Sequence, residues 1–376
     1  MRIAIPAETL PGERRVAATP ETVHKLVAAG HRVTVQTGAG GGAMIRDHAF
    51  AEAGARLVED AAGACLDADM VLKVRAPTEE ELAVLRQGAV VVALFAPYTN
   101  PLLARYNAAN LTCFALELVP RISRAQSMDV LSSQANIAGY KAVLMAQHYY
   151  PRFMPMLMTA AGTVQPARVL VLGAGVAGLQ AIATARRLGA TVEAFDVRAA
   201  AREQVESLGA RFVEVESDES GEDAGGYARE MSEEYKRRQA ALIAERAEAA
   251  DIIITTAMIP GRPAPVLIPP EVVGRMRMGS VIVDLAAAAG GNCPLTRKDE
   301  VVHHAGVTII GDTNIPSRMA ADASSLYARN VLHFAGLLFD DGGGLRIDAE
   351  DAIVSATLLC HEGSFLQPRF LESGGG

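Results

Sequence analysis

The chain has 376 residues, half of them hydrophobic, and a formal net charge of -8 at pH 7. This length favours two domains over one, and the apolar content excludes global disorder. The acidic balance argues against a surface for nucleic acid or anionic membranes, although a local site could still bind a small anion. Four cysteines stand far apart and form no C-x-x-C motif, which favours buried reduced thiols and no metal site: Cys65, Cys113, Cys293 and Cys360.

The N-terminal third of the chain alternates between short apolar runs and helical patterns, as in a parallel sheet covered by helices. We expect strands at residues 2–5, 32–36, 70–74 and 90–95. Helices are expected at residues 20–29, capped by Thr19 and followed by proline, and at residues 79–86. The chain starts directly with a strand, without a signal peptide, and no apolar run approaches the roughly 18–20 residues that span a membrane. A soluble, cytoplasmic protein is therefore expected.

A second series of the same kind follows. Strands are expected at residues 168–172, 191–195, 252–255, 281–284 and 307–310, with helices at residues 176–188, 202–208, 229–249 and 270–276. Residues 214–223 are acidic and glycine-bearing, and we expect a long mobile loop there. Long helices near residues 127–150 and 320–339 would cross between the domains. The prediction is an α/β protein with two doubly wound, Rossmann-like domains, built from residues 1–131 with 320–376 and from residues 132–319.

A glycine-rich turn joins the first strand and helix of this second series. It consists of Gly173, Ala174, Gly175, Val176, Ala177 and Gly178. In a dinucleotide-binding turn the first glycine permits the tight bend, and the second lets pyrophosphate approach the backbone. The third lets the helix pack closely on the strand. Phosphates then face the positive end of the helix. A turn that binds nothing is the alternative, but the flanking strand, helix and distal acidic residue favour nucleotide binding.

The distal acidic residue is Asp196, which ends the next strand and is followed by Val197 and Arg198. Its carboxylate is expected to accept hydrogen bonds from the adenosine ribose and to repel a 2′-phosphate, which favours NAD over NADP. Arg198 could soften that preference or could be a surface residue. A second glycine run, at residues 38–42, lacks a following helix and a distal acidic residue, so we interpret it as a flexible loop.

Residues 120–134 form a polar segment where a strand ends at an expected interdomain cleft. The segment offers a cation, an amide and a carboxylate, which could hold a nicotinamide and its ribose. It could equally be a loop in which Ser127 and Asp129 cap the next helix, and the chemistry alone leaves both open.

This segment carries a family resemblance. Residues 121–134, 160–163, 173–180 and 290–294 resemble the NAD(H)-binding component of proton-translocating transhydrogenase, and the likeness runs over nearly the whole chain. The string Arg-Ile-Ser-Arg-Ala-Gln-Ser-Met-Asp, which starts at Arg121, is its most specific portion. Because the sequence lacks membrane helices and an NADP(H) domain, it resembles the separate soluble α1-type subunit. Such a subunit lies at the cytoplasmic face of the inner membrane through partner subunits, and the family implies a homodimer.

The resemblance implies roles for particular residues. Those that would hold the nicotinamide half of NADH are Arg121, Gln126, Asp129 and Ser132. Gln126 would also reach toward the NADP(H) held by the partner. Further residues that would contact NAD(H) are Gly226, Tyr227, Gln239, Thr256 and Met258. Tyr227 resembles the aromatic residue of a loop that closes over the nucleotide; alternatively, it starts a helix and packs on its own domain.

The N-terminal residues 11–17 and Lys73 also resemble alanine dehydrogenase, where an arginine and a lysine bind the substrate carboxylate and keto oxygen. Arg15 and Lys73 stand at these positions, but alanines replace the family's proton-handling histidine and aspartate, in residues 94–97 and 284–290. The two cations could instead form interdomain ion pairs. Hydride transfer between two nicotinamides needs no such proton carrier. We therefore expect a transhydrogenase subunit; an alanine dehydrogenase-like enzyme and a non-catalytic NAD(H) sensor are the alternatives.

Overall fold

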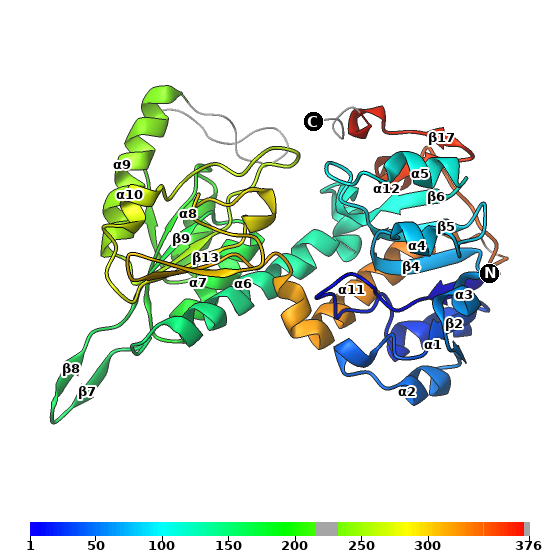
Figure 1. Cartoon of the computed structure of the whole chain (residues 1–376), viewed down its shortest axis with the longest axis horizontal. Helices are drawn as coiled ribbons and strands as arrows, with labels where there is room; N and C mark the ends of the chain where they lie inside the picture. The colour runs from blue at the N-terminus through cyan, green and yellow to red at the C-terminus, as the bar shows by residue number, and fades with distance from the viewer. Residues whose placement is uncertain (216–231, 341, 372–376) are drawn as a thin grey trace. The chain divides into compact units, whose positions relative to one another are not determined.

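The computed structural model of the chain describes residues 1–215, 232–340 and 342–371 (Figure 1). The chain divides into two compact units. Unit 1 combines Met1–Gln134 with Pro316–Gly376, and unit 2 is the continuous segment Ala135–Ile315. The chain therefore passes between the units twice, first inside helix α6 (Val130–Tyr149) and then inside the short helix η5 (Ile315–Met319).

Unit 1 contains an eight-stranded sheet in the order β17-β16-β6-β5-β4-β1-β2-β3. Its first six strands in the sequence are parallel: β1 (Arg2–Ile5), β2 (Arg32–Gln36), β3 (Arg56–Val58), β4 (Met70–Arg75), β5 (Val90–Leu94) and β6 (Thr112–Ala115). The chain adds strands on one side of β1 and then returns to its other side, which is the doubly wound order of a Rossmann fold. Two antiparallel strands complete one edge: β16 (Leu358–His361) and β17 (Ser364–Phe365).

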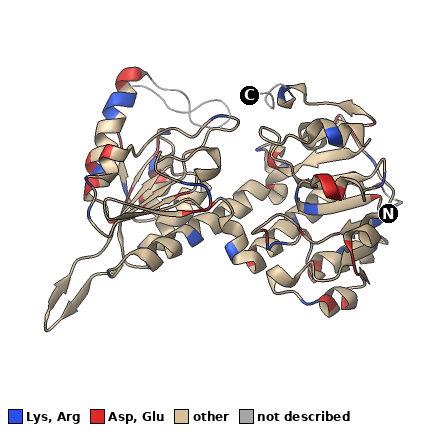
Figure 2. Ribbon diagram, in the orientation of Figure 1, with Lys and Arg blue, Asp and Glu red and all other residues tan. Residues whose placement is uncertain are grey.

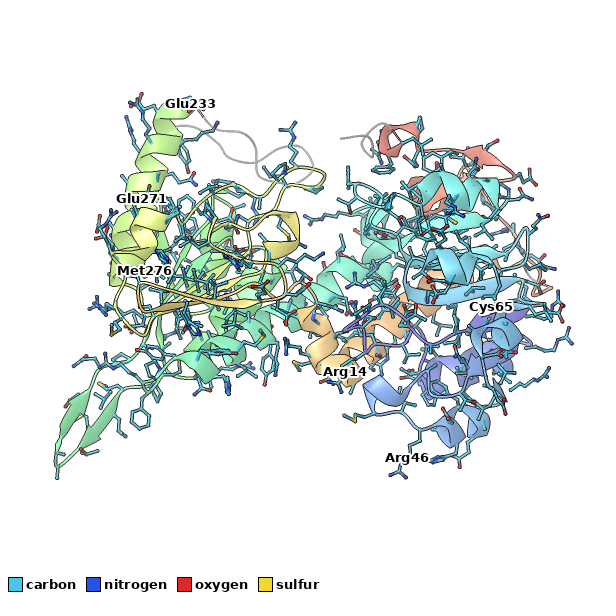
Figure 3. The ribbon with its side chains drawn as sticks, in the orientation of Figure 1. Arg14, Arg46, Cys65, Glu233, Glu271 and Met276 are labelled. Carbon is cyan, nitrogen blue, oxygen red and sulfur yellow. The ribbon has the colours of Figure 1, made fainter. Side chains whose placement is uncertain are left out.

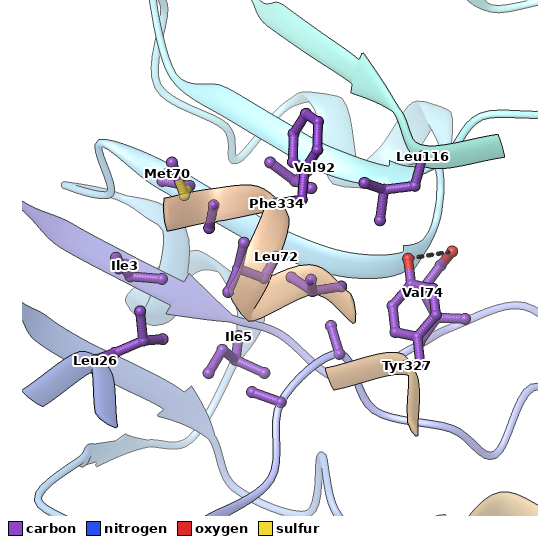
Figure 4. Packing of buried hydrophobic residues seen from close by; sticks show 14 of the residues in the cluster. Ile3, Ile5, Leu26, Met70, Leu72, Val74, Val92, Leu116, Tyr327 and Phe334 are labelled. Carbon is purple, nitrogen blue, oxygen red and sulfur yellow. Dashed lines mark hydrogen bonds between the residues drawn. The ribbon is translucent and has the colours of Figure 1, made fainter. Parts of the chain in front are cut away.

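Helices cover both faces of the unit 1 sheet. On one face lie α1 (Pro20–Ala28), α11 (Ala320–Ala335) and α12 (Ala352–Thr357), and on the other α3 (Ala61–Cys65) and α5 (Leu103–Ala108). The remaining helices are α2 (Asp47–Glu52), α4 (Glu79–Leu82), η1 (Gly41–Ala43), η2 (Leu116–Leu118), η3 (Ser123–Met128), η6 (Gly336–Leu338) and η7 (Pro368–Phe370). Figure 4 shows Phe334 and Tyr327 of α11 among the aliphatic side chains of the sheet, with the Tyr327 hydroxyl donating to the Val74 carbonyl.

Unit 2 repeats this architecture in a seven-stranded sheet, ordered β11-β10-β9-β12-β13-β15-β14. The strands are β9 (Arg168–Leu172), β10 (Thr191–Phe195), β11 (Arg211–Val213), β12 (Ile252–Thr255), β13 (Val281–Asp284), β14 (Val301–His304) and β15 (Val307–Ile310). All pairs are parallel except that of β14 with β15. Successive residues of β9 point to opposite faces, and both faces are buried, which explains its continuous apolar run.

One face of the unit 2 sheet is covered by α6, α7 (Val176–Arg187) and α8 (Ala201–Ser207), and the other by α9 (Glu233–Ala249) and α10 (Pro270–Val273). The short helix η4 (Ala287–Ala289) follows β13. Charged side chains of both signs lie along α9 (Figure 2), and Glu233 stands at its N-terminal end (Figure 3). A separate hairpin of β7 (Leu157–Thr159) and β8 (Gly162–Val164) projects from the unit.

The fold class expected from the sequence is confirmed, while two local expectations are wrong. The glycine run at residues 38–42 is a tightly packed turn rather than a loose loop. A Cβ on Gly40 would lie 2.7 Å from the Phe50 ring, and one on Gly42 would lie 2.5 Å from the Arg14 carbonyl oxygen. Helix α4 ends at Leu82 instead of residue 86, because the following amides bond three residues back and tighten the last turn.

All four cysteines are buried free thiols. Within the described ranges, no helix combines the length and apolar character needed to cross a membrane, and no cluster of histidine, cysteine or carboxylate side chains is suited to a metal ion.

Candidate functional site

The glycine-rich turn lies where the strand order of the unit 2 sheet reverses, between β9 and its neighbours β10 and β12. Ligands of open parallel sheets bind at this point, outside the carboxyl ends of the strands. Gly173 has a φ of 101°, and its amide donates to the Phe195 carbonyl at 2.8 Å. A Cβ on Gly178 would lie 1.8 Å from the Gly173 carbonyl oxygen. Both glycines are therefore required by the turn itself.

Gly175 differs from these two glycines. A Cβ at this position would meet no atom of the described residues within 4 Å. Its φ of -75° is open to any residue, so the protein's own packing does not demand glycine there. Gly175 is also the N-cap residue of α7, whose first amides receive no hydrogen bond from a capping side chain. The space beside Gly175 thus adjoins the positive end of a helix of 12 residues.

The acidic residue after β10 lies against this turn. The Asp196 carboxylate accepts a hydrogen bond from the Ala174 amide at 2.7 Å. It also accepts from Arg198, through the backbone amide, Nε and Nη2, each at 2.9 Å. Arg198 is an ion-pair partner of Asp196 rather than an isolated surface residue, and its side chain is 22% exposed. The neighbouring Val197 is half-buried.

Thr256 follows β12 and supports the same turn from its other side. Its hydroxyl donates to the Gly173 carbonyl at 3.0 Å, and its amide donates to the Leu172 carbonyl at 2.8 Å. Met258, two residues later, is exposed. The structure thus brings the glycine-rich turn, Asp196 and Thr256 together at the carboxyl ends of β9, β10 and β12.

Asn292 is a supporting residue that the sequence analysis did not identify. Its fully buried amide donates to the carbonyl oxygens of Ala257 and Pro265, at 2.9 and 2.8 Å, and accepts from the Ala257 amide at 3.2 Å. One side chain therefore fixes the segment that carries Thr256 and Met258. The only signal in the sequence is a polar residue after two glycines in an otherwise apolar region, and that signal does not identify the partner.

The other residues expected to contact NAD(H) are placed as follows. Gln239 is half-buried on α9, in the same unit as the glycine-rich turn. Gly226 and Tyr227, with most of the acidic segment expected as a mobile loop, lie outside the described residues.

The polar segment at residues 121–132 belongs to unit 1, where it leads through η3 into α6. Arg121 and Gln126 are exposed. Asp129 accepts from the Ser132 amide at 2.8 Å and from its hydroxyl at 2.6 Å. Asp129 therefore caps α6, as one of the two interpretations of this segment expected. The cap also fixes Ser132 beside Asp129.

The cations shared with alanine dehydrogenase are buried in unit 1 and paired with carboxylates. Arg15 contacts Glu13 at 2.6 Å, and Lys73 contacts Glu8 and Glu81 at 3.3 and 2.9 Å. Burial alone would raise the pKa of Glu13, but hydrogen bonds and charge from Arg15 outweigh it and lower that pKa. All these partners lie in the same unit, so the expectation of interdomain ion pairs is corrected.

Neither position of the dehydrogenase proton carriers holds a titratable side chain. Ala96 occupies the first, with a φ of 49°, and its amide donates to the Glu117 carboxylate. Burial raises the pKa of Glu117, whose other oxygen accepts from the Phe95 amide at 3.1 Å. The second position lies in η4, which contains only alanine. His303 and His304 are exposed on β14.

The sequence matches two profiles of one family. Residues 4–138 match "Alanine dehydrogenase/PNT, N-terminal domain", and residues 142–368 match "Alanine dehydrogenase/PNT, C-terminal domain". The chain belongs to the alanine dehydrogenase/PNT family. Within it, the chain is 51% identical to the first of the two chains that form the NAD(P) transhydrogenase alpha subunit of Rhodospirillum rubrum, over the full length of both sequences.

Two further relatives bracket the chain within the alanine dehydrogenase/PNT family. A crystal structure of transhydrogenase from Sinorhizobium meliloti has a TM-score of 0.89 and 49% identity, and covers 97% of this chain and 100% of its own. The alanine dehydrogenase of Mycobacterium tuberculosis is 30% identical, over 98% of this chain and 95% of its own. Similarity is thus much higher to the transhydrogenases than to the dehydrogenase.

Proposed function

We propose that this chain is the NAD(H)-binding subunit of a proton-translocating transhydrogenase. NADH bound to this chain would transfer a hydride reversibly to NADP+ held by a partner subunit. Separate membrane subunits would couple that transfer to proton movement. The chain would act with its partner as a peripheral protein at the cytoplasmic face of the inner membrane, and as a homodimer.

The observation that carries this proposal is the alanine at both positions where the dehydrogenases of this family place a proton carrier. Oxidation of an amine or an alcohol releases a proton that a side chain must accept. Transfer from a dihydronicotinamide to a pyridinium moves one hydrogen with both electrons, from C4 to C4, and exchanges no substrate proton. A site without acid–base groups suits the second reaction.

The nucleotide site in unit 2 supports NAD(H) as the substrate of this chain. The space beside Gly175 can admit pyrophosphate against the first amides of α7, where the helix end favours negative charge. Asp196 stands at the end of the next strand, where a carboxylate accepts the ribose hydroxyls and disfavours a 2′-phosphate. Thr256 and Met258 would contact the nucleotide from the neighbouring strand end, and Gln239 and Tyr227 would complete the binding site.

The loop of residues 121–132 would orient the nicotinamide. Arg121 and Gln126 are exposed and able to reach a ligand, while Asp129 and Ser132 form a fixed hydrogen-bonded pair. Their work would be positioning, because hydride transfer requires the two C4 atoms to approach to roughly 3–3.5 Å in the correct orientation. NADP(H) would be supplied by the partner subunit, and Gln126 would face it.

The experiment that tests the proposal combines this chain with the NADP(H)-binding component of a transhydrogenase. Deuterated NADH, labelled on the transferred face of C4, is mixed with NADP+, and the product NADPH is analysed by mass spectrometry. Direct transfer predicts one deuterium per NADPH formed and little reaction from either component alone. Product without deuterium, or no product, would contradict the proposal.

An alanine dehydrogenase activity is the competing function, which the 30% identity to the mycobacterial enzyme brings into consideration. It predicts that the isolated chain oxidises NADH when pyruvate and ammonia are added. We expect no such consumption, since neither Ala96 nor η4 can exchange the substrate proton. A sensor of NAD(H) would bind NADH yet fail in both assays.

A further inference from the structure

The loop that carries Arg121 and Gln126 is attached to the C-terminal region of the chain. Although its outer residues are exposed, Ala125 and Met128 are buried, at 1% and 6%, in the same core cluster as Tyr327 of α11. Helix α11 packs directly against η3. Residues about 200 positions away in the sequence, by the separations of the hydrogen-bonded pairs, therefore support this short loop.

An ion pair makes the first polar attachment. Arg124 donates from Nη2 to Oδ1 of Asp351 at 2.8 Å, and its Nη1 lies 2.7 Å from Oδ2. The two groups thus meet in a bidentate geometry, which fixes direction as well as distance. The same Asp351 carboxylate caps α12 by accepting from the Ile353 and Val354 amides. These contacts hold the pKa of Asp351 at about 2, with the Arg124 hydrogen bond as the main cause.

A buried amide makes the second attachment. Asn330 of α11 donates from Nδ2 to the Ser127 carbonyl at 2.7 Å. Its Oδ1 is buried and has no hydrogen-bond partner among the described residues. An unpaired buried acceptor destabilises a protein, so an apolar side chain here would serve stability better. Departures of this kind are expected where a position serves function.

We propose that Asp351 and Asn330 are positioning residues, which hold the loop of Arg121 and Gln126 in its reactive placement for hydride transfer. This inference rests on the function proposed above. Neither residue is given a role in contacting the nucleotide. Asp351 would act through Arg124, and Asn330 through the Ser127 carbonyl. Together they would fix the loop at points on either side of Gln126.

The proposal distinguishes positioning from folding. Arg124 is 52% exposed, and an exposed ion pair adds little to the stability of a fold. Small displacements of a group that orients reactants are far more serious, since a misplacement of about 1 Å can slow a reaction roughly hundred-fold. Loss of the pair should therefore slow hydride transfer while the thermal midpoint of unfolding and the affinity for NADH stay nearly unchanged.

The test uses the full chain reconstituted with the NADP(H)-binding component. Asp351→Asn removes the charge but keeps a good capping residue for α12, and Arg124→Gln removes the other partner. The matched control is Arg329→Gln, because Arg329 is 50% exposed and bonds Glu21 of the same unit through Nε and Nη2. Transfer rates are measured at saturating NADH and saturating partner, alongside NADH affinity and thermal unfolding. Hydrogen exchange reports the order of residues 123–128.

We expect Asp351→Asn and Arg124→Gln each to slow transfer roughly ten-fold and the double variant no further, as for two residues acting through one contact. Amides of residues 123–128 should exchange faster in both, and Arg329→Gln should match the wild type. Asn330→Leu, which keeps a side chain of similar size, should slow transfer without lowering stability. An active wild type with all variants within about two-fold of it would overturn the inference. An inactive wild-type mixture would instead overturn the proposed function, and this inference with it.

Discussion

Replacement of Asp196 by alanine should exchange the nucleotide preference of the chain. In the structure this carboxylate receives the Ala174 amide and three groups of Arg198. Alanine would remove the acceptor offered to the ribose hydroxyls and would release the guanidinium of Arg198 at the same point. A released guanidinium is suited to bind a 2′-phosphate bidentately.

The magnitude follows from the charged hydrogen bonds to the ribose. Each is worth about 1.5–3 kcal/mol, and about 1.4 kcal/mol corresponds to a tenfold change in dissociation constant. Asp196→Ala should therefore weaken NADH binding roughly ten- to hundred-fold and strengthen NADPH binding. The assay is titration of nicotinamide fluorescence, which is favourable because the chain contains no tryptophan.

The matched control is Asp251→Ala in the same unit. Asp251 is buried, accepts from the Arg168 amide at 2.8 Å and contacts Arg277 at 3.2 Å, but it lies at the amino ends of the strands. Its loss removes a comparable aspartate–arginine contact away from the nucleotide. Equal weakening of NADH binding in both variants, or an unchanged NADH affinity in Asp196→Ala, would refute the reasoning.

Three further predictions concern the turn, the loop and the buried charges. Gly175→Ala should fold normally yet bind NADH more weakly, whereas Gly178→Ala should lower the melting temperature, because its Cβ would collide with a carbonyl oxygen at 1.8 Å; nucleotide titration and thermal unfolding separate the two. Gln126→Asn should slow hydride transfer in the reconstituted complex far more than it weakens NADH affinity, and an unchanged rate would contradict the role of the loop. Glu13→Gln breaks a buried ion pair and should destabilise the chain by about 3–5 kcal/mol at pH 7. The folded-state pKa of Glu13 is depressed, so its contribution is complete above the unfolded value of about 4.3 and is lost as pH falls below it; denaturant titrations should show the difference between wild type and variant narrowing in acid.

Much of the fold could be predicted because local chemistry determines it. The strands β9 and β10 are short apolar runs buried on both faces, and their bounds are those expected from the sequence. Helix α1 starts where Thr19 and Pro20 predict, with Thr19 accepting from the Thr22 amide. Signals of this kind depend on residues within one turn or one strand, so they can be read without tertiary structure.

Other elements depend on distant partners. Strand β6 reads Thr-Cys-Phe-Ala, with too few β-branched residues for a clear strand signal, and is stabilised between β5 and the antiparallel β16 from near the other end of the chain. The run at residues 38–42 contains glycine because the Arg14 backbone and the Phe50 ring approach it closely. Neither approach is visible in the sequence.

The candidate site divides in the same way. The position of the glycine-rich turn beside Asp196 follows from the order of strand, turn and helix, which the sequence displays. The roles of Arg121, Gln126, Asp129 and Ser132 stay predictions. Supports such as Asn292 and Asp351 could not be found from the sequence, because each acts on a segment far from it along the chain.

The discontinuity of unit 1 has a consequence during synthesis. Unit 2 is one uninterrupted segment and can fold as soon as it leaves the ribosome, whereas unit 1 lacks α11, α12 and β16 until translation is nearly finished. Until then the β6 edge and the apolar face destined for α11 stay uncovered, a hazard for self-association of the nascent protein. Premature termination after residue 315 should therefore yield an aggregation-prone product with an intact nucleotide fold.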